Sequence, residues 1–298
     1  MVLELAVGIA TAGRRDQLTL TLEQIATSQT LPSVVLICPA SPDDFDGNVP
    51  ERLEGRVRVV SAPRGLCSQR NAIIRACEGM DIITFFDDDF YPSPSYLERV
   101  RQVFERHDDV VVLTGRPVLD GATGPGLSHE EAVAALARQE LARRKKREAR
   151  LKKTYGGYGC NMSLRLETIR RNGLRFDENL PLYGWLEDID FSRQMKRFGR
   201  VVIDKELRGV HLGTKRGRSP GRQLGYSQVV NPIYMLRKGT MGYGFALKFV
   251  LRNLTKNAVR SLSPEPWVDR RGRFVGNAIA LAEVCLGKAH PERATMYR

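Results

Sequence analysis

Three consecutive carboxylates, Asp87, Asp88 and Asp89, follow the apolar run of residues 82–86. Negative charge at the end of a buried strand is costly, so a compensating cation is expected nearby. In an extended chain the side chains of Asp87 and Asp89 share a face. Two carboxylates on one face suit a hard divalent cation that also binds phosphate oxygens. A solvated acidic turn is the alternative interpretation.

A second candidate, Arg70, lies in the loop that begins at Gly65 and ends at Asn71. The helical composition of residues 71–77 places Arg70 at the start of a helix. Its planar fork of donors suits a phosphate, and the dipole at a helix start also favours an anion. The alternative is an ordinary surface arginine.

The segment of residues 182–190 combines an aromatic turn, with Tyr183 and Trp185, and the acids Glu187, Asp188 and Asp190. Acids at a helix start are ordinary capping residues. Capping does not explain Trp185, whose indole is a good platform for the apolar face of a sugar ring. A carboxylate at this position could take the proton from an attacking hydroxyl.

His211 stands alone in its segment, after a strand expected at residues 201–203. A single histidine is more often a structural residue than a ligand. The metal site predicted at the acidic trio makes His211 a candidate third ligand.

The elements that must position these residues alternate between strands and helices. Apolar or β-branched runs predict strands at 5–11, 34–38, 57–60, 82–86, 160–164 and 201–203. Helical patterns cover residues 16–28, 71–77, 128–153, 167–172 and 188–198. This alternation predicts an α/β fold with a mostly parallel sheet flanked by helices, and ligands bind at the carboxyl ends of such strands. Beyond residue 215 long basic helices are expected, so we assign 1–215 to a catalytic domain and 216–298 to a basic helical region.

The charge is unevenly distributed along the chain. The 298 residues carry a net charge of +13, and residues 216–298 alone hold 15 Lys and Arg against 4 Asp and Glu. A second basic run lies at residues 138–153. These patches predict an anionic partner, either a membrane surface or nucleic acid, with solvated basic helices as the alternative. The tail lacks interleaved stacking aromatics, which disfavours nucleic acid.

The chain contains no apolar stretch long enough to span a membrane and does not begin with a basic leader. Its five cysteines are odd in number, with no close pair, which predicts reduced thiols and a cytoplasmic location. From residue 245 to 262 the basic residues Lys248, Arg252, Lys256 and Arg260 recur every four positions beside an apolar face. Such a helix can lie on an anionic membrane, here the inner face of the plasma membrane, or pack on the catalytic domain.

Together these segments resemble the glycosyltransferase family 2 pattern on the GT-A fold, over roughly residues 5–213. The pieces stand in the family's order. They are the turn after Thr11, the loop ending in Arg70-Asn71, the DxD-like Asp87-Asp88-Asp89, and the segments Gly159-Cys-Asn-Met-Ser163, Phe176-Asp177-Glu178 and Glu187-Asp188-Ile-Asp190.

The resemblance implies an inverting, single-displacement transferase. Asp87, Asp89 and His211 would hold Mn²⁺ or Mg²⁺, and an imidazole ligand favours Mn²⁺. Asp188 would be the general base, with Glu187 orienting the acceptor. The donor would contact Thr11, Arg14, Arg70, Asn71, Asp87 and Asp88, and the acceptor would contact Tyr183 and Trp185.

The expected reaction moves a sugar from a nucleotide diphosphate, with a UDP-sugar first, to a hydroxyl of a glycan or lipid-linked acceptor in polysaccharide or glycoconjugate synthesis. The second strand departs from the family, because Cys38-Pro39-Ala40-Ser41 replaces its acidic ending and acids come only at Asp43 and Asp44. The identity of the base therefore stays open. The alternatives are a sugar-phosphate nucleotidyltransferase, in which the 187–190 acids have no role, and a basic nucleic-acid-binding module.

Overall fold

The computed structural model of the protein describes residues 2–142, 151–217 and 219–297. The chain forms two compact units. Unit 1 comprises residues 1–64, 68–175 and 194–217, and unit 2 comprises residues 65–67, 176–193 and 218–298. Unit 2 therefore contains segments from the middle of the chain as well as the C-terminal helices.

An eight-stranded sheet forms the centre of unit 1, in the order β3-β2-β1-β4-β9-β6-β10-β8. Its parallel half consists of β1 (Leu5–Thr11), β2 (Val34–Pro39), β3 (Val57–Val59) and β4 (Ile82–Asp87). The other half contains β6 (Val110–Gly115), β8 (Lys152–Lys153), β9 (Asn161–Arg165) and β10 (Arg200–Asp204). β9 is antiparallel to both neighbours, whereas β6 and β10 are parallel. The expected mostly parallel sheet is thus confirmed.

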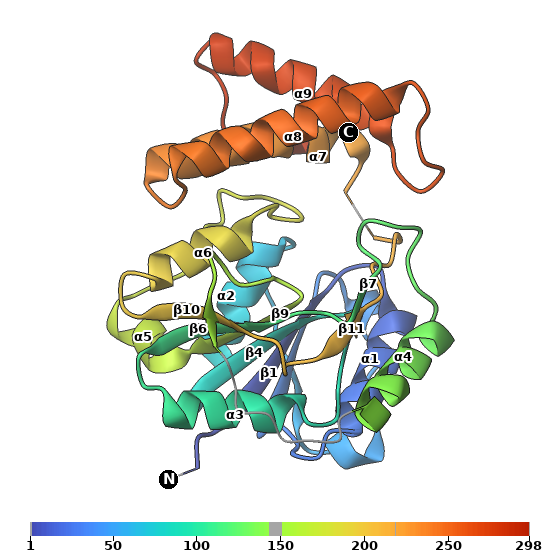
Figure 1. The fold of residues 1–298 in the computed structure, drawn as a ribbon, viewed down its shortest axis with the longest axis vertical. Coiled ribbons are helices and arrows are strands. Elements are labelled where there is room, and N and C mark those ends of the chain that lie inside the picture. The colour runs from blue at the N-terminus through green and yellow to red at the C-terminus, as the bar shows by residue number, and fades with distance from the viewer. Residues whose placement is uncertain (1, 143–150, 218, 298) are drawn as a thin grey trace. The chain divides into compact units, whose positions relative to one another are not determined.

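Helices flank the strands of unit 1 (Figure 1). They are α1 (Arg15–Ala26), α3 (Tyr96–Arg106), α4 (His129–Ala142) and α5 (Leu166–Arg171), while α2 (Leu66–Ala76) and α6 (Glu187–Met195) have residues in both units. The short 3₁₀ helices η1 (Pro42–Asp44) and η2 (Glu51–Leu53) lie in loops. Leu18, Leu22 and Ile25 of α1 belong to the same buried core as Ile9 and Ile37 of the sheet, which agrees with their helical spacing.

A second, three-stranded sheet in unit 1 has the order β5-β11-β7. β5 (Phe90–Pro92) is antiparallel to β11 (Gly209–His211), and β7 (Leu119–Asp120) is parallel to it. In this register His211 is paired with Phe90 on one side and with Asp120 on the other. This small sheet therefore fixes the position of His211 relative to the acidic turn that precedes Phe90.

Unit 2 contains three long helices, α7 (Gly221–Lys238), α8 (Tyr243–Ser261) and α9 (Arg270–Cys285), followed by η3 (Pro291–Met296). The expected basic helical C-terminal region is confirmed. α7 and α9 approach closely at Gly225, where an added Cβ would lie 2.1 Å from the carbonyl oxygen of Arg273. Among the helices in the described parts of the chain, none has the length and apolar character to cross a membrane.

Two expected helices have different bounds in the structure. α2 begins at Leu66, directly after the Pro63-Arg64-Gly65 segment, so Arg70 lies in its second turn and not at its start. The helix expected across 128–153 is observed as α4 over 129–142, and residues 143–150 lie outside the described residues. Its expected end is wrong, because Lys152 and Lys153 pair with β10 as strand β8.

Candidate metal and nucleotide site

The acidic trio occupies the end of β4 and the turn that follows it. The strand ends at Asp87, and Asp88 and Asp89 form the tight turn to β5. The expectation that extended geometry aligns Asp87 with Asp89 is therefore wrong. The turn itself brings them together, because ligand atoms of Asp87, Asp89 and His211 all lie within 4.8 Å of one another.

The Asp89 carboxylate is buried and only partly satisfied by donors. Its Oδ2 accepts a hydrogen bond of 2.7 Å from the Thr214 amide. Its Oδ1 has no hydrogen-bond partner of adequate geometry among the described residues, and His211 Nε2 lies 3.4 Å away. Buried polar atoms are rarely left without a partner. Two carboxylates, one of which has this unsatisfied oxygen, and one imidazole form a donor set that fits a divalent cation such as Mn²⁺.

Asp120 contacts Nδ1, the ring nitrogen of His211 that points away from Asp89. The sequence alone did not identify Asp120 as a site residue. Nδ1 of His211 lies 3.0 Å from Asp120 Oδ1, and the Tyr158 hydroxyl donates to Asp120 Oδ2 at 2.8 Å. Burial alone would lower the pKa of His211, but the hydrogen bond with Asp120 and the nearby negative charge of Asp89 raise it to about 10. Burial also acts to raise the pKa of Asp120, but the hydrogen bond with His211 outweighs it. The pKa of Asp120 therefore lies below its ordinary value.

Asp88 is bound inside the protein by two residues that were expected to line the nucleotide. Thr11 Oγ1 donates to it at 2.7 Å, and Arg14 Nη1 donates at 2.8 Å. Burial raises the pKa of Asp88 to about 6, although Arg14 acts in the opposite direction. Arg14 also donates to the carbonyls of Thr214 and Arg216. It thereby ties the segment after β11 to the end of β1.

Arg70 is almost fully buried, with 2% of its surface exposed. Its Nη2 donates to the Gly159 carbonyl at 2.8 Å and lies 3.3 Å from Asp87 Oδ1, and its guanidinium stacks 5.2 Å from the centroid of the Phe85 ring. The expected helix-start position is therefore wrong. Arg70 instead contacts Asp87 from the interior of the protein, and the neighbouring Asn71 is buried as well.

The acids of the 187–190 segment differ in their surroundings within unit 2. Asp190 is fully buried and accepts hydrogen bonds from Lys238 Nζ, at 2.7 Å, and from Thr240 Oγ1. Lys238 also donates to Asp177 at 2.6 Å. Asp188 is half-buried at the first turn of α6, and its Oδ1 accepts from the Ile189 amide. Asp190 therefore serves as a structural anchor, which leaves Asp188 as the more accessible acid.

The aromatic turn before α6 has an unusual backbone. Leu182 and Leu186 have φ angles of 58° and 75°, in the left-handed region that residues other than glycine rarely adopt. Tyr183 is 53% exposed, whereas Trp185 is half-buried and packs edge-on against Phe249 at 5.9 Å between ring centroids. A small pocket is lined by both aromatic residues together with Gln223 and Ser227 of α7.

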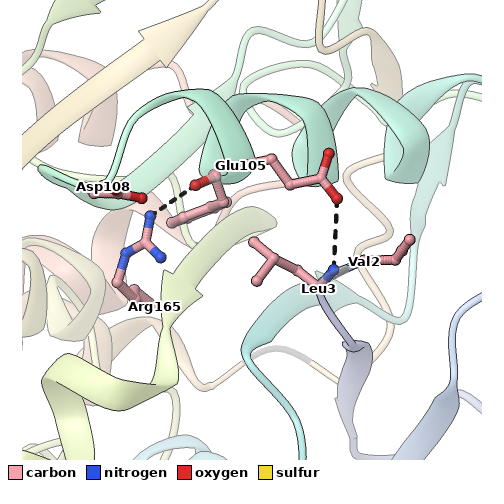
Figure 2. A pocket seen from close by; sticks show the side chains of 6 residues that line it. Val2, Leu3, Glu105, Asp108 and Arg165 are labelled. Atoms are coloured by element: carbon pink, nitrogen blue, oxygen red, sulfur yellow. Dashed lines mark hydrogen bonds between the residues drawn. The ribbon is translucent and has the colours of Figure 1, made fainter.

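A larger hollow of unit 1 lies elsewhere, between the N-terminal segment, α3 and β9 (Figure 2). In it Arg165 donates to the Phe104 carbonyl at 3.0 Å, and the Leu3 amide donates to the Glu105 carboxylate at 3.5 Å. Leu3 precedes β1, so the hollow lies at the amino end of that strand. Ligands of such sheets bind at the carboxyl ends, and none of the candidate site residues lines this hollow.

The sequence matches the model of glycosyl transferase family 2 over residues 7–172. A structure of S. aureus TarS 1–349 in complex with UDP-GlcNAc is similar, with 13% identity, a TM-score of 0.57, and coverage of 99% of this chain and 83% of that one. The mannosyltransferase PcManGT from Pyrobaculum calidifontis, in complex with GDP-Man and Mn²⁺, has 14% identity, a TM-score of 0.54 and coverage of 99% and 79%. Glucosyl-3-phosphoglycerate synthase from Mycobacterium tuberculosis, in complex with Mn²⁺, UDP and glucosyl-3-phosphoglycerate, has 15% identity, a TM-score of 0.50 and coverage of 81% and 82%. No match was found among curated protein sequences.

Proposed function

Because the chain belongs to glycosyl transferase family 2, we propose that it is an inverting, metal-dependent enzyme that moves a sugar from a nucleotide diphosphate, with a UDP-sugar as first candidate, to a hydroxyl of a glycan or lipid-linked acceptor. The observation that carries this proposal is the cluster of Asp87, Asp89 and His211. Family membership also disfavours the nucleotidyltransferase and nucleic-acid-binding alternatives.

Proteins of the same fold support a nucleotide-sugar donor, since they have been captured with UDP-GlcNAc, or with GDP-Man and Mn²⁺. In this chain Asp87, Asp89 and His211 would hold the Mn²⁺. When bound, the cation would neutralise the charge that develops on the diphosphate leaving group. The Oδ1 atom of Asp89, which accepts no hydrogen bond of adequate geometry from the described residues, would provide one of the ligand atoms.

Each ligand residue has a neighbour that fixes its side chain. Arg70 contacts Asp87, Thr214 donates to Asp89, and Asp120 holds His211. Such partners orient ligands before the substrate arrives, which lowers the cost of reorganisation. We assign the same supporting role to Thr11 and Arg14, which both donate hydrogen bonds to Asp88. We also propose that Thr11, Arg14 and Asn71 border the nucleotide.

The proposed base is Asp188, with Glu187 beside it. The base takes the proton of the acceptor hydroxyl while the acceptor oxygen attacks the anomeric carbon of the donor sugar. The bond from that carbon to the diphosphate oxygen breaks, and the nucleoside diphosphate leaves. Asp190 is disfavoured in this role because both of its oxygens accept hydrogen bonds from Lys238 and Thr240. Tyr183 and Trp185 are the proposed contacts for the acceptor ring.

Calorimetry with UDP and GDP, each with Mn²⁺ or with EDTA, tests the proposal. Asp87→Asn is the most informative variant because this residue is 29% exposed and its loss leaves the buried contacts of Asp89 intact. We expect the variant to lose metal-dependent nucleotide binding. Asp108→Asn, an exposed acid in the Figure 2 hollow, is the matched control. Equal affinity in Mn²⁺ and EDTA for whichever nucleotide binds would overturn the metal-dependent mechanism.

A further inference from the structure

Hydrogen bonds between α8 and α9 show which side of each helix faces the other. Asn257 Nδ2 of α8 donates to Asn277 Oδ1 of α9 at 2.9 Å, and Arg270 Nη1 donates to Asn257 Oδ1 at 3.0 Å. Arg271 Nε donates to the Ser261 carbonyl at 3.4 Å, so the end of α8 lies beside the start of α9. The two helices therefore share a seam along part of their length.

On α8 the side near this seam is apolar. Leu254 packs in the buried cluster that contains Ala280 and Ile279 of α9. Leu247 and Leu251 precede Leu254 by seven and three residues, so they lie on the same side of the helix. Yet they are 44% and 52% exposed. The apolar stripe of α8 is therefore packed at Val250 and Leu254 and open to solvent at Leu247 and Leu251.

The α9 side of the seam continues this apolar surface. Phe274 and Leu281 follow Arg270 and Asn277 by four residues each, which places them in the row that faces α8. They are 44% and 40% exposed. Leu247, Leu251, Phe274 and Leu281 together form what we term the seam surface.

A basic stripe runs along α8 beside the seam surface. Its members are all exposed: Lys248, Arg252, Lys256 and Arg260. α8 contains no acidic residue. Of the nearby acids, Glu265 is paired with Arg270, and Glu283 with Arg293. The pKa of Lys256 is below its ordinary value because of burial and because of the positive charges of neighbouring arginines. The stripe therefore carries positive charge that the surrounding unit does not neutralise.

We propose that the seam surface and the basic stripe bind an anionic lipid membrane. The apolar side chains would enter the headgroup region, and the long Lys and Arg side chains would reach the lipid phosphates. The sequence left open whether this helix packs or binds lipid. Val250 and Leu254 take the packing role, and the exposed residues remain for the lipid.

Charge and side-chain chemistry favour this partner over two others. A two-fold contact with a second copy of the chain would bring each basic stripe near its own equivalent, which is repulsive. A soluble polyanion would bind the basic residues but has no use for exposed Leu and Phe side chains. Membrane binding does not depend on the proposed transferase activity, because it is measured without any donor or acceptor.

The test is co-sedimentation of the full chain with vesicles of phosphatidylcholine alone and with vesicles that also contain phosphatidylglycerol. We expect binding to the second kind, and weakening in high salt. Changing Lys248, Arg252, Lys256 and Arg260 to Gln should weaken it about a hundred- to a thousandfold. The matched control changes four exposed basic residues of unit 1 to Gln, namely Arg58, Arg106, Arg197 and Lys205, and should have little effect.

A second measurement separates insertion from simple charge attraction. Cys285 is exposed, whereas Cys38, Cys67, Cys77 and Cys160 are buried, so a thiol-reactive environment-sensitive fluorophore will label Cys285. Cys285 lies one turn beyond Leu281 on α9. We expect a blue shift on addition of phosphatidylglycerol vesicles, and Leu251→Gln with Leu281→Gln should weaken binding about tenfold or more without lowering the urea midpoint.

Three results would overturn the proposal. Equal binding to the two kinds of vesicle excludes recognition of anionic lipid. Tight binding to heparin that the leucine variants leave unchanged, with no blue shift on vesicles, identifies a soluble polyanion as the partner. A concentration-dependent dimer without lipid, lost in the leucine variants, assigns the seam surface to a second copy of the chain.

Discussion

At the scale of single residues, the imidazole of His211 depends on a carboxylate from another strand. Asp120 Oδ1 lies 3.0 Å from Nδ1 of His211, which leaves Nε2 directed toward Asp89. A carboxylate behind a ligating histidine fixes the orientation of the ring and raises its basicity. The Tyr158 hydroxyl in turn holds Asp120.

We therefore expect Asp120→Asn to weaken Mn²⁺ binding by about 10–100-fold. The amide keeps the size of the side chain but removes its negative charge. Calorimetric titration of Mn²⁺ in the presence of UDP measures the change. Asp109→Asn, which breaks an exposed ion pair with Arg200, is the control and should bind Mn²⁺ normally. An unchanged Mn²⁺ affinity in Asp120→Asn would show that His211 is not positioned in this way.

The neighbouring acids Asp188 and Asp190 should separate into a catalytic and a structural role. Asp188→Asn should lower turnover by about 10²–10⁴-fold, because the amide cannot accept the proton, with nucleotide affinity and melting temperature nearly unchanged. Asp190→Asn removes one partner from a buried ion pair with Lys238 and should cost about 3 kcal/mol of stability. Turnover is measured with the donor that calorimetry identifies, and stability by urea unfolding. Wild-type turnover in Asp188→Asn would place the base elsewhere, with Glu187 next.

These residues show what the sequence can predict of the site. Acids after an apolar strand indicated a cation site, and the structure brings Asp87 and Asp89 together with His211. Asp120 could not be found in this way, because its role arises from the pairing of the two-residue strand β7 with β11. A strand so short leaves no periodic pattern in the sequence. The burial of Arg70 was also missed, since its partners Gly159 and Asp87 come from distant segments.

At the scale of elements, the packing of α7 against α9 depends on glycines. A Cβ on Gly225 would lie 2.1 Å from the carbonyl oxygen of Arg273, and one on Gly276 would lie 2.1 Å from that of Arg222. Both obstacles are backbone atoms of the facing helix, so they cannot move aside without shifting the helix. The close contact of these helices therefore requires glycine, which has no Cβ, at both positions.

Gly225→Ala and Gly276→Ala should each destabilise the protein by about 1–3 kcal/mol through overpacking. Gly244→Ala in α8 is the matched control, because nothing lies within 4 Å of its added Cβ. Alanine is the better helix former, so this variant should be at least as stable as the wild type. Urea unfolding of the three variants measures these changes. Equal stability of all three would show that α7 and α9 do not pack as closely as the structure indicates.

The bounds of elements could be predicted where local patterns decide them. Helix α1 and strands β1, β2 and β4 lie within a few residues of their predicted positions because hydrophobic periodicity and turn residues define them. Lys152 and Lys153 were expected in a helix on composition, but pairing with β10 makes them a strand. Tertiary pairing overrides intrinsic propensity in such cases.

At the scale of the whole molecule, unit 1 ends at residue 217, close to the boundary expected near residue 215, but unit 2 also includes internal segments of the chain. Residues 176–193 group with the C-terminal helices in unit 2. Leu186 belongs to a buried cluster with Met235, Met241 and Ala246, while Asp177 and Asp190 both bind Lys238. We therefore propose that the segment that carries the candidate base folds together with α7 and α8. On this proposal the C-terminal helices are required to form the acceptor part of the catalytic site.

A chain ending at residue 217 tests this proposal. It keeps Asp87, Asp89 and His211 with the supporting Thr214, so we expect Mn²⁺ binding to stay within about tenfold of the full chain. It loses Lys238 and the methionines that cover Leu186, so the amides of residues 176–193 should exchange hydrogen rapidly and transfer should be abolished. Hydrogen–deuterium exchange and calorimetry on the two chains measure both effects. Retained protection of residues 176–193 together with retained transfer would show instead that residues 1–215 form a self-sufficient catalytic domain. The full-length Lys238→Met variant keeps the apolar cover but removes the ion pairs, and it should show exchange rates between those of the two chains.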